Sequence, residues 1–372
     1  MACEVRILDF NFAFQSETDI TATSEDVNFP ASNLRQFNRS KTWRSSGTFI
    51  IDSTNSSLDF DIGGGEITAT LTTGTYTPTT LATEIATQMN VVSTDTHTAT
   101  YDGTTGKWTI DSDGGTFSLL TNTGSNTATS VFTSIGFDTA ADKTGAATYT
   151  GENVAIHTEE NVVFDLKTTE DIDAFSFILD PLDGNKFTSS VVIKLQANAT
   201  DVWTSPAVDE TITLDSRYDI ALKVFSTAQS YRYWRVQITD PSNPNLYVEI
   251  PKIFLSDSTL LSQNPEIGWK FLFTDRSKII TTEFGHEYAD VFPQLRGFEF
   301  DFAVMDNTAV VTLEDIFRSV GSVTPVLFSL DSTGGLYDAE QFLLYSKFDA
   351  EFGSEHVNVT LFNKQLKLRE VL

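Results

Sequence analysis

The stretch Tyr231–Asp240 reads YRYWRVQITD. Its apolar and polar residues alternate along the segment. Trp234, Val236 and Ile238 fall on one face of an extended chain, and the other face carries Tyr233, Arg235, Gln237 and Thr239. Alternation with a period of two is typical of a strand that buries one face. We therefore predict a half-buried strand with an aromatic core face and a polar, partly cationic outer face.

The same alternation recurs in four further segments of the second half of the chain. These are Val191, Ile193, Leu195 and Ala197; Trp269, Phe271 and Phe273; Phe298, Phe300, Phe302 and Val304; and Val357, Val359 and Leu361. Such runs, bounded by turn residues, indicate half-buried strands of antiparallel sheets. The sequence therefore predicts a mainly β protein.

Two segments have the apolar periodicity of helices. Thr77 and Pro78 have the pattern of an N-cap and a first-turn proline, and Asn90 ends the segment. The apolar positions between them are Leu81, Ile85 and Met89. Thr312 and Asp315 form a capping-box pattern, and Gly321 ends that segment. Its apolar positions are Leu313, Ile316, Phe317 and Val320. Each helix is expected to pack its apolar stripe on a sheet.

The charge balance of the chain excludes several functions. The 372 residues carry 24 Lys+Arg and 51 Asp+Glu, a net charge of −27, and 40% of the residues are hydrophobic. Binding to nucleic acid or to an anionic membrane requires a basic surface, so we expect neither. Cys3 is the single cysteine, which precludes an intrachain disulfide and a cysteine-based zinc site. No apolar run is long enough for a transmembrane helix, so we expect no membrane insertion.

Composition divides the chain into three units. Residues 45 to 160 contain two basic residues against fourteen acidic ones, a net charge of −12, together with many Thr, Ser and Gly. We interpret 48–156 as an acidic Thr/Gly-rich module with a small sheet and one helix. It interrupts a unit formed by 1–47 and 157–258. A polar stretch from Ser256 to Pro265 precedes the third unit, 259–372, which we interpret as a β domain with one helix.

Motifs that carry chemistry are missing from the sequence. His286 and Glu287 begin like HExxH, but Asp290 occupies the position of the second histidine, so the zinc motif fails. The other histidines, His97, His157 and His356, have no partner at metal-ligand spacing. The Asp-rich segments 111–115 and 180–185 lack the spacing of a calcium loop, and we interpret them as β-turns. We expect no enzyme activity, no metal and no cofactor.

Six segments, taken in order, resemble the discoidin family of galactose-binding-like jelly rolls. They are PASNLRQFNRSKTWRSSG (30–47), NVVFDL (161–166), VVIKLQAN (191–198), DVWTSP (201–206), YRYWRVQITDPSNPN (231–245) and EIPKIFLSD (249–257). Two departures stand out: the cysteine pair of that family is absent, and more than a hundred residues separate Trp43 from Val162. The resemblance implies a discoidin-like jelly roll with the acidic module inserted at a loop, which costs little because loop-closure entropy rises slowly with length.

The third unit is similar to the closing segments of tail-tip and minor tail proteins of long-tailed bacteriophages. The similarity lies in a helix ending in Gly321, then SVTPVLFSLDS (322–332), and a final stretch VTLFNKQLKLREVL (359–372). The acidic module is similar to small modules of phage virion proteins through TYTPTTLATEIATQMN (75–90) and SIGFDTAADKTG (134–145). The resemblance implies a structural virion protein of a distal tail or baseplate, made in the bacterial host cytoplasm.

The leading hypothesis is therefore a structural protein that assembles into a homo-oligomeric ring, a trimer or a hexamer, around the tail tube or hub. Its expected partners are other copies of itself and other tail proteins such as tube, hub or fibres. The jelly roll and its module would face outward and contact the host surface. The C-terminal unit would supply the subunit contacts by strand pairing and apolar patches. The candidate interface residues are Trp269, Phe271, Phe273, Phe298, Phe300 and Phe302.

A second hypothesis is a carbohydrate-binding adhesin whose jelly-roll loops bind a host-surface glycan. A sugar ring stacks on an aromatic face, and its hydroxyl groups need planar polar partners. The candidate ligand-binding residues are Trp43, Arg44, Trp203 and Tyr218. A third hypothesis, a glycan-degrading enzyme, requires two carboxylates in one cleft, and sequence distance does not restrict such a pair.

Overall fold

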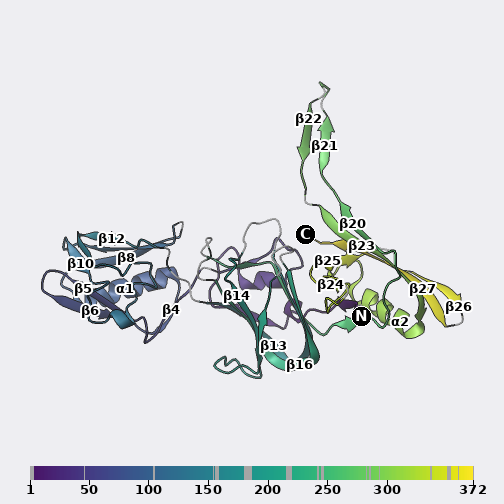
Figure 1. Ribbon diagram of the computed structural model, residues 1–372, viewed down its shortest axis with the longest axis horizontal. Helices are drawn as coiled ribbons and strands as arrows, with labels where there is room; N and C mark the ends of the chain where they lie inside the picture. The colour runs from purple at the N-terminus through teal and green to yellow at the C-terminus, as the bar shows by residue number, and fades with distance from the viewer. Residues whose placement is uncertain are drawn as a thin grey trace.

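The computed structural model describes residues 4–371 except 46, 104, 154, 156–158, 180–186, 215–219, 241–242, 244–246, 282, 285, 293, 336, 350–352 and 359. It confirms the predicted fold class, because the chain is mainly β and its sheets are antiparallel. Three regions follow one another along the long axis: the inserted module at one end, the jelly roll in the middle and the C-terminal β domain at the other end (Figure 1).

The jelly roll is built on two very long strands, β13 (Glu160–Ile178) and β16 (Ile220–Thr239), which pair along most of their length. They lie in the middle of a six-stranded sheet with β15 (Val208–Ile212), β14 (Val192–Asn198), β18 (Lys252–Ser256) and β2 (Asp19–Ala22). A two-stranded ribbon and two 3₁₀ helices complete the region: β3 (Trp43–Arg44), β17 (Glu249–Ile250), η1 (Phe12–Phe14) and η2 (Ala31–Arg35).

The alternation in YRYWRVQITD is confirmed at its core face. The side chains of Trp234, Val236 and Ile238 are fully buried and belong to the core of the jelly roll. The neighbouring strand contributes Ile193, Leu195 and Ala197, which are opposite these three residues or next to them in register. Cross-strand packing of aromatic and β-branched side chains stabilises such a sheet.

The inserted module has its own core, made of residues between Phe49 and Ala155. Its strands form a four-stranded sheet, a three-stranded sheet and one ribbon. In sheet order they are β11 (Lys143–Ala146), β10 (Phe117–Leu119), β5 (Ser57–Asp61) and β6 (Glu66–Thr70); β12 (Thr148–Thr150), β9 (Lys107–Ser112) and β8 (His97–Asp102); and β4 (Phe49–Ile51) with β7 (Gly74–Tyr76). A short 3₁₀ helix, η3 (Thr127–Thr129), lies beside β5.

The module's helix α1 (Pro78–Val92) begins as the sequence predicts and ends two residues later than predicted. Thr77 is the N-cap, its hydroxyl accepts from the amide of Thr80, and Pro78 occupies the first helical position, where a missing N–H costs nothing. Leu81, Ile85 and Met89 are buried against the sheets. The predicted apolar stripe therefore holds the helix on its sheet.

The C-terminal β domain is an eight-stranded sheet covered by the helix α2 (Asn307–Val320). Along the sheet the strands are β19 (Thr259–Leu260), β1 (Arg6–Leu8), β24 (Val326–Ser329), β25 (Leu343–Phe348), β27 (Leu361–Glu370), β23 (Leu295–Asp306) and β20 (Lys270–Thr274), with β26 (Ser354–Asn358) paired to β27. A further hairpin, β21 (Lys278–Thr281) and β22 (Glu287–Asp290), projects away from this sheet (Figure 1).

Two details differ from the sequence prediction. Strand β1 pairs with β24 and β19, so the start of the chain belongs to the C-terminal sheet and not to the jelly roll. Helix α2 begins at Asn307, ahead of the predicted start at Thr312. Asp306 is the N-cap, because its carboxylate accepts from the amide of Ala309 at 2.8 Å. Thr312 lies inside the helix and donates to the carbonyl of Thr308.

An apolar cluster joins the jelly roll to the C-terminal sheet. Phe254 of β18 packs its ring against Tyr345 of β25, with ring centroids 5.6 Å apart. The cluster also contains Leu8, Ala174, Ile178, Ile220, Leu327 and Leu343. The Tyr345 hydroxyl donates to the carbonyl of Phe37 at 2.6 Å, which satisfies the polar end of that buried ring. Since the two regions share buried side chains, we expect them to unfold together.

Replacement of Phe254 by alanine tests this coupling. We expect F254A to lower the stability of the jelly roll and the C-terminal domain together by about 3–5 kcal/mol, the usual cost of emptying a buried phenylalanine site. F132A is the matched control, because Phe132 lies in the separate core of the module. Calorimetric unfolding should show two transitions, a larger one for the jelly roll with the C-terminal domain and a smaller one for the module. F254A should shift the larger transition, and F132A should shift the smaller one. If F254A and F132A shift the same single transition, the two cores are not independent.

Candidate functional site

The four residues predicted to bind a glycan differ in how exposed they are, and one of them is not described. Trp43 is fully buried, and its indole N–H donates to the carbonyl of Ser24 at 3.1 Å. Its ring therefore fills the jelly-roll core and offers no face to a sugar. Arg44 is bound by the buried carboxylate of Glu249 at 2.7 Å. Tyr218 lies outside the described residues. Arg44 and Trp203 are both half-buried, and of these two Trp203 is the one with an aromatic ring.

Trp203 takes part in a polar cluster on the outer face of the jelly-roll sheet. The guanidinium carbon of Arg235 lies 4.6 Å from the centroid of its ring, and its indole N–H donates to Asp201 at 2.6 Å. Arg235 donates to the side-chain oxygen of Gln196, whose amide nitrogen donates to Asp209 at 3.0 Å. An aromatic ring is thus held beside amide and charged groups on neighbouring strands, a combination that sugar hydroxyls can use.

A second stacked pair lies next in this sheet. Arg232 binds Asp165 through two hydrogen bonds of 2.7 and 2.9 Å, and its guanidinium lies 4.8 Å from the centroid of the Tyr233 ring. The hydrogen bond from Arg232 holds the pKa of Asp165 well below its ordinary value. Tyr233 and Arg235 are on the outer face that the sequence predicts. The sequence does not show their partners, which come from other strands.

The predicted interface residues separate into core and surface. Phe298, Phe300 and Phe302 are buried beneath α2 in the core of the C-terminal domain. Their alternation identifies a core face, so these rings are not available to another subunit. Trp269 and Phe271 are partly buried and pack on the same core. Phe273 is the exception, with 64% of its surface exposed at the end of β20.

Phe273 lies at the base of a hairpin, residues 275–294, that we call the arm. The arm contains β21 and β22 and extends from β20 and β23 into solvent (Figure 1). Ile279, Phe284 and Val291 have 68%, 89% and 82% of their surfaces exposed, and Ile280, Tyr288 and Phe292 are also exposed. These residues were not among the predicted interface residues.

Both faces of the arm are apolar. Ile279 and Ile280 are consecutive, so their side chains point to opposite faces of the ribbon. In register, Ile280 is opposite Tyr288 and Ile279 is opposite Ala289. A two-stranded ribbon is marginally stable by itself, and contiguous exposed apolar surface typically marks an interaction site. The adjacent pair Ile279 and Ile280 is the sequence signal for this surface, because a strand that covers a core alternates instead.

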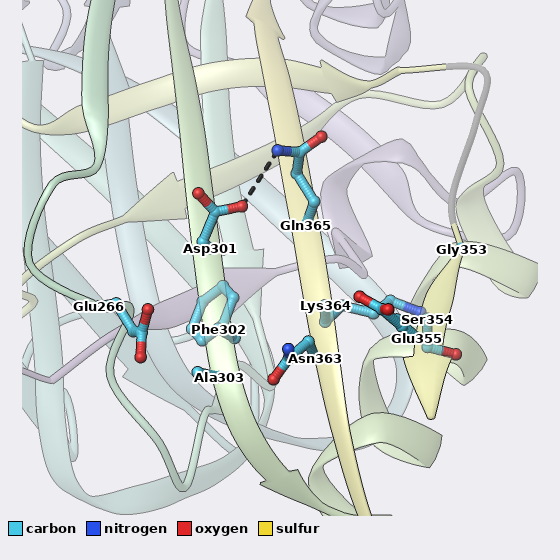
Figure 2. Close-up of a pocket in the computed structure, with 10 residues that line it drawn as sticks. All are labelled: Glu266, Asp301, Phe302, Ala303, Gly353, Ser354, Glu355, Asn363, Lys364 and Gln365. Atoms are coloured by element: carbon cyan, nitrogen blue, oxygen red, sulfur yellow. Dashed lines mark hydrogen bonds between the residues drawn. The ribbon is translucent and has the colours of Figure 1, made fainter. Parts of the chain in front are cut away.

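A cavity of about 580 Å³ lies on the opposite part of the same domain, between β23, β26 and β27 (Figure 2). Asp301 of β23 accepts a hydrogen bond from Gln365 of β27 at 3.0 Å, and Figure 2 shows this pair at one end of the cavity. Lys364 is buried, and its ammonium lies 3.7 Å from Glu314 of α2. Its pKa is lowered by burial. These contacts fasten β27 to the neighbouring strand and to the helix.

The histidines and acidic turns add no candidate metal site. His97 is buried between the rings of Phe60 and Phe117, and burial lowers its pKa. His286 and His356 are exposed, whereas His157 and the segment 180–185 lie outside the described residues. Within the described residues, no group of three or more His, Cys, Asp and Glu side chains is arranged to hold a metal ion. None of the helices described is long and apolar enough to cross a bilayer.

Glu160 is a buried acid at the point where the inserted module joins the jelly roll. Its carboxyl group accepts from the hydroxyl of Ser24 at 2.9 Å and from the hydroxyl of Thr48, which directly precedes the module's first strand. Burial raises the pKa of Glu160 to about 8, although both hydrogen bonds act in the opposite direction. At neutral pH the carboxyl group is therefore largely protonated.

No family model matches the sequence, and no curated protein matches it. Among solved structures, the chain is similar to the family 32 carbohydrate-binding module of Clostridium perfringens NanJ in complex with galactose, with a TM-score of 0.29 and 9% identity over 69% of this chain and 99% of that one. It is similar to a CpGH89 family 32 module from Clostridium perfringens in complex with GalNAc-β-1,3-galactose, with a TM-score of 0.29 and 7% identity over 66% of this chain and 99% of that one. A third similar structure is a chitosan-binding module of a Paenibacillus chitosanase/glucanase, with a TM-score of 0.25 and 12% identity over 66% of this chain and 98% of that one.

The protonation of Glu160 gives a test by pH. Because its folded pKa of about 8 lies above the unfolded value, the folded state keeps a proton that the unfolded state has released. This contribution to stability is complete at about pH 4 and falls as the pH rises to about 8, by at most about 1.4 kcal/mol per pH unit. E160Q should remove this dependence and should be more stable than the native chain at pH 8. Thermal unfolding of the native chain and of E160Q at pH 5 and pH 8 measures this pH dependence of stability.

The control for this experiment is E159Q, which removes a neighbouring charge that is the smallest of the causes shifting the pKa of Glu160 and leaves the buried carboxyl group in place. E159Q should keep the pH dependence of the native chain. An equal flattening in E159Q and E160Q would mean that general charge repulsion, and not the buried proton, causes the dependence.

Proposed function

We propose that this protein is a structural subunit of a larger assembly and that the arm is its main contact with a second copy of the chain. The observation that carries the proposal is the exposure of apolar side chains on both faces of the arm. Covering such a surface with a partner is favourable because it removes apolar area from water. Ile279 and Ile280 keep 68% and 58% of their surfaces exposed beside their cross-strand neighbours.

The length of the arm suits contact between subunits. The arm runs from 275 to 294, and an extended segment of about ten residues on each side of its tip spans about 30 Å, close to the diameter of a small domain. It projects from a sheet that is held in place by the apolar cluster around Phe254 and Tyr345. A partner therefore meets an arm whose base is already ordered, which lowers the entropy cost of association.

The resemblance in sequence gives the proposed assembly a specific form. We place the protein in the virion, as a ring of three or six copies around the tube or hub of a phage tail, made in the host cytoplasm. In this arrangement the C-terminal β domain faces its neighbours, and the jelly roll and acidic module face outward toward the host surface. The module's net charge of −10, from twelve acidic and two basic residues in 48–156, would keep outward-facing copies apart by repulsion.

The double variant I280T/F284S tests the role of the arm. Both substitutions remove exposed apolar area while the threonine keeps a strand-forming residue in β21. We expect self-association of the full chain to weaken by at least about tenfold, with unchanged circular dichroism. Light scattering over a range of protein concentrations measures the association.

V27T is the matched control, because Val27 is 89% exposed and lies outside the arm. It should associate as the native chain does. A native chain that stays monomeric at every concentration would contradict self-assembly through the arm, and so would an equal loss of association in both variants.

We also propose glycan binding by the outer face of the jelly roll as a second candidate function. The observation that favours it is the cluster of Trp203 and Arg235, in which a half-buried ring and a half-buried guanidinium group are stacked and the guanidinium is held by the buried side chain of Gln196. The two functions use different regions of the chain, so an assembled ring would present several copies of this face. Several weak sites on one assembly bind a surface more tightly than one site does.

W203A tests glycan binding separately from assembly. We expect the variant to bind glycans at least about tenfold more weakly, since it loses the aromatic face on which a sugar ring stacks. Y288A is the control, because it removes an exposed ring from the arm and leaves the jelly roll intact. Glycan arrays followed by calorimetric titration of the best ligand measure both variants. Equal binding by W203A and the native chain would exclude this face as the site.

A further inference from the structure

Three positively charged side chains line one small pocket at the base of the arm. Arg276 comes from the arm, Lys347 from β25 and Arg369 from β27. The pocket has a volume of about 280 Å³, and Leu295, Glu370 and Val371 complete its lining. This concentration of positive charge contrasts with the net charge of the whole chain, which is −27.

The register of the sheet places two of these cations directly against each other. Lys347 of β25 is paired with Arg369 of β27, and Arg369 is paired on its other side with Gly297 of β23. Like charges at directly opposed positions destabilise a sheet. Glycine has no side chain that could shield either cation or pair with it. The fold therefore holds an unfavourable pair of charges at this position.

No acid of the described chain neutralises the three cations. Neither a salt bridge nor a side-chain hydrogen bond joins Arg276, Lys347 or Arg369 to another described residue. Glu370 lines the pocket, but its carboxylate is already bound by Arg296 at 2.7 Å and lies 3.5 Å from Arg39. Its charge is therefore shared between two other guanidinium groups.

At the neighbouring register position of the same sheet, two lysines do have a carboxylate partner. Lys270 binds Glu299 at 2.9 Å, and Lys367 lies 3.9 Å from that carboxylate. Glu299 lies between these two lysines in register, whereas in the next row on the same face Gly297 occupies the position of Glu299, beside Arg369. Lys347 is on the other side of Arg369, so in this row the two cations are adjacent and the acid is replaced by glycine.

We propose that this pocket binds an oxyanion, either a carboxylate or a phosphate group, between Arg276, Lys347 and Arg369. A planar guanidinium group binds either anion through two parallel hydrogen bonds, and lysine adds a point charge. The volume admits a group of this size with some of its hydration water. A bound anion would supply the negative charge that Glu299 supplies one row away.

Inorganic phosphate is the first probe, applied to the full chain at constant ionic strength with chloride as the reference. Phosphate should raise the melting temperature of the native chain, and the dissociation constant from a concentration series should be about fivefold weaker in K347Q and in R369Q, the effect of one charge at about 4 Å in water. Without phosphate, K347Q should melt higher than the native chain, because the substitution removes the opposed like charge.

K278Q is the matched control, since Lys278 is an exposed lysine of the arm outside this pocket. It should keep the native response to phosphate. Two results would overturn the proposal: a native chain whose melting temperature is the same in phosphate and chloride, or a loss of the phosphate effect in K278Q equal to that in K347Q.

The source of the anion is distinguished by light scattering in the same solutions. If an acidic side chain of a second copy occupies the pocket, phosphate competes with it and dissociates the native assembly, and K347Q associates weakly without phosphate. If the pocket takes a free anion, phosphate raises the melting temperature and leaves the state of association unchanged. The effect of phosphate on the melting temperature can be measured whether the chain is a monomer or an oligomer. This test therefore remains valid if self-assembly does not occur.

Discussion

The arrangement of this molecule depends on the buried joint between the jelly roll and the C-terminal sheet. Besides the apolar cluster around Phe254, the joint contains Lys252, whose fully buried ammonium donates to the carbonyls of Lys41 and Pro251 at 2.7 and 2.6 Å. Burial lowers the pKa of Lys252 to about 7, and the nearby charge of Arg39 acts in the same direction. Arg39 itself reaches across to Glu370 of the C-terminal sheet. Polar groups buried in this way need fixed partners, so the two regions have one preferred relative position.

The fold was predictable from sequence wherever a local pattern determines an element. Strand alternation located the core face of Trp234, and the proline and threonine at 77–78 located the start of α1. The assignment of β1 failed because Arg6 of this three-residue strand pairs with Leu260 and Ser329, more than 250 residues away. A strand that short has too little pattern to identify its sheet, and tertiary pairing decides where it lies.

The candidate site was less predictable, because residue type alone does not determine exposure. Trp43, Phe298 and Phe300 are large aromatic residues and fill cores, whereas Ile279, Phe284 and Val291 are exposed together on the arm. Period-two alternation marks burial on one side. The consecutive isoleucines of the arm break that rule and were the available signal. The cationic pocket left no signal in the sequence, since Arg276, Lys347 and Arg369 come together only through the register of β25 with β27 and the position of the arm.

Exposed apolar strands promote non-specific aggregation unless something restricts their pairing. The arm has two such restrictions. Its strands pair with each other, so their inner backbone groups are satisfied, and its base carries a cationic pocket next to apolar Leu272 and Phe273. A partner that covers the apolar faces but brings no anion to the pocket leaves Lys347 and Arg369 opposed. Apolar area then supplies most of the affinity and the pocket supplies the selectivity, because charge complementarity discriminates between partners more than it strengthens binding.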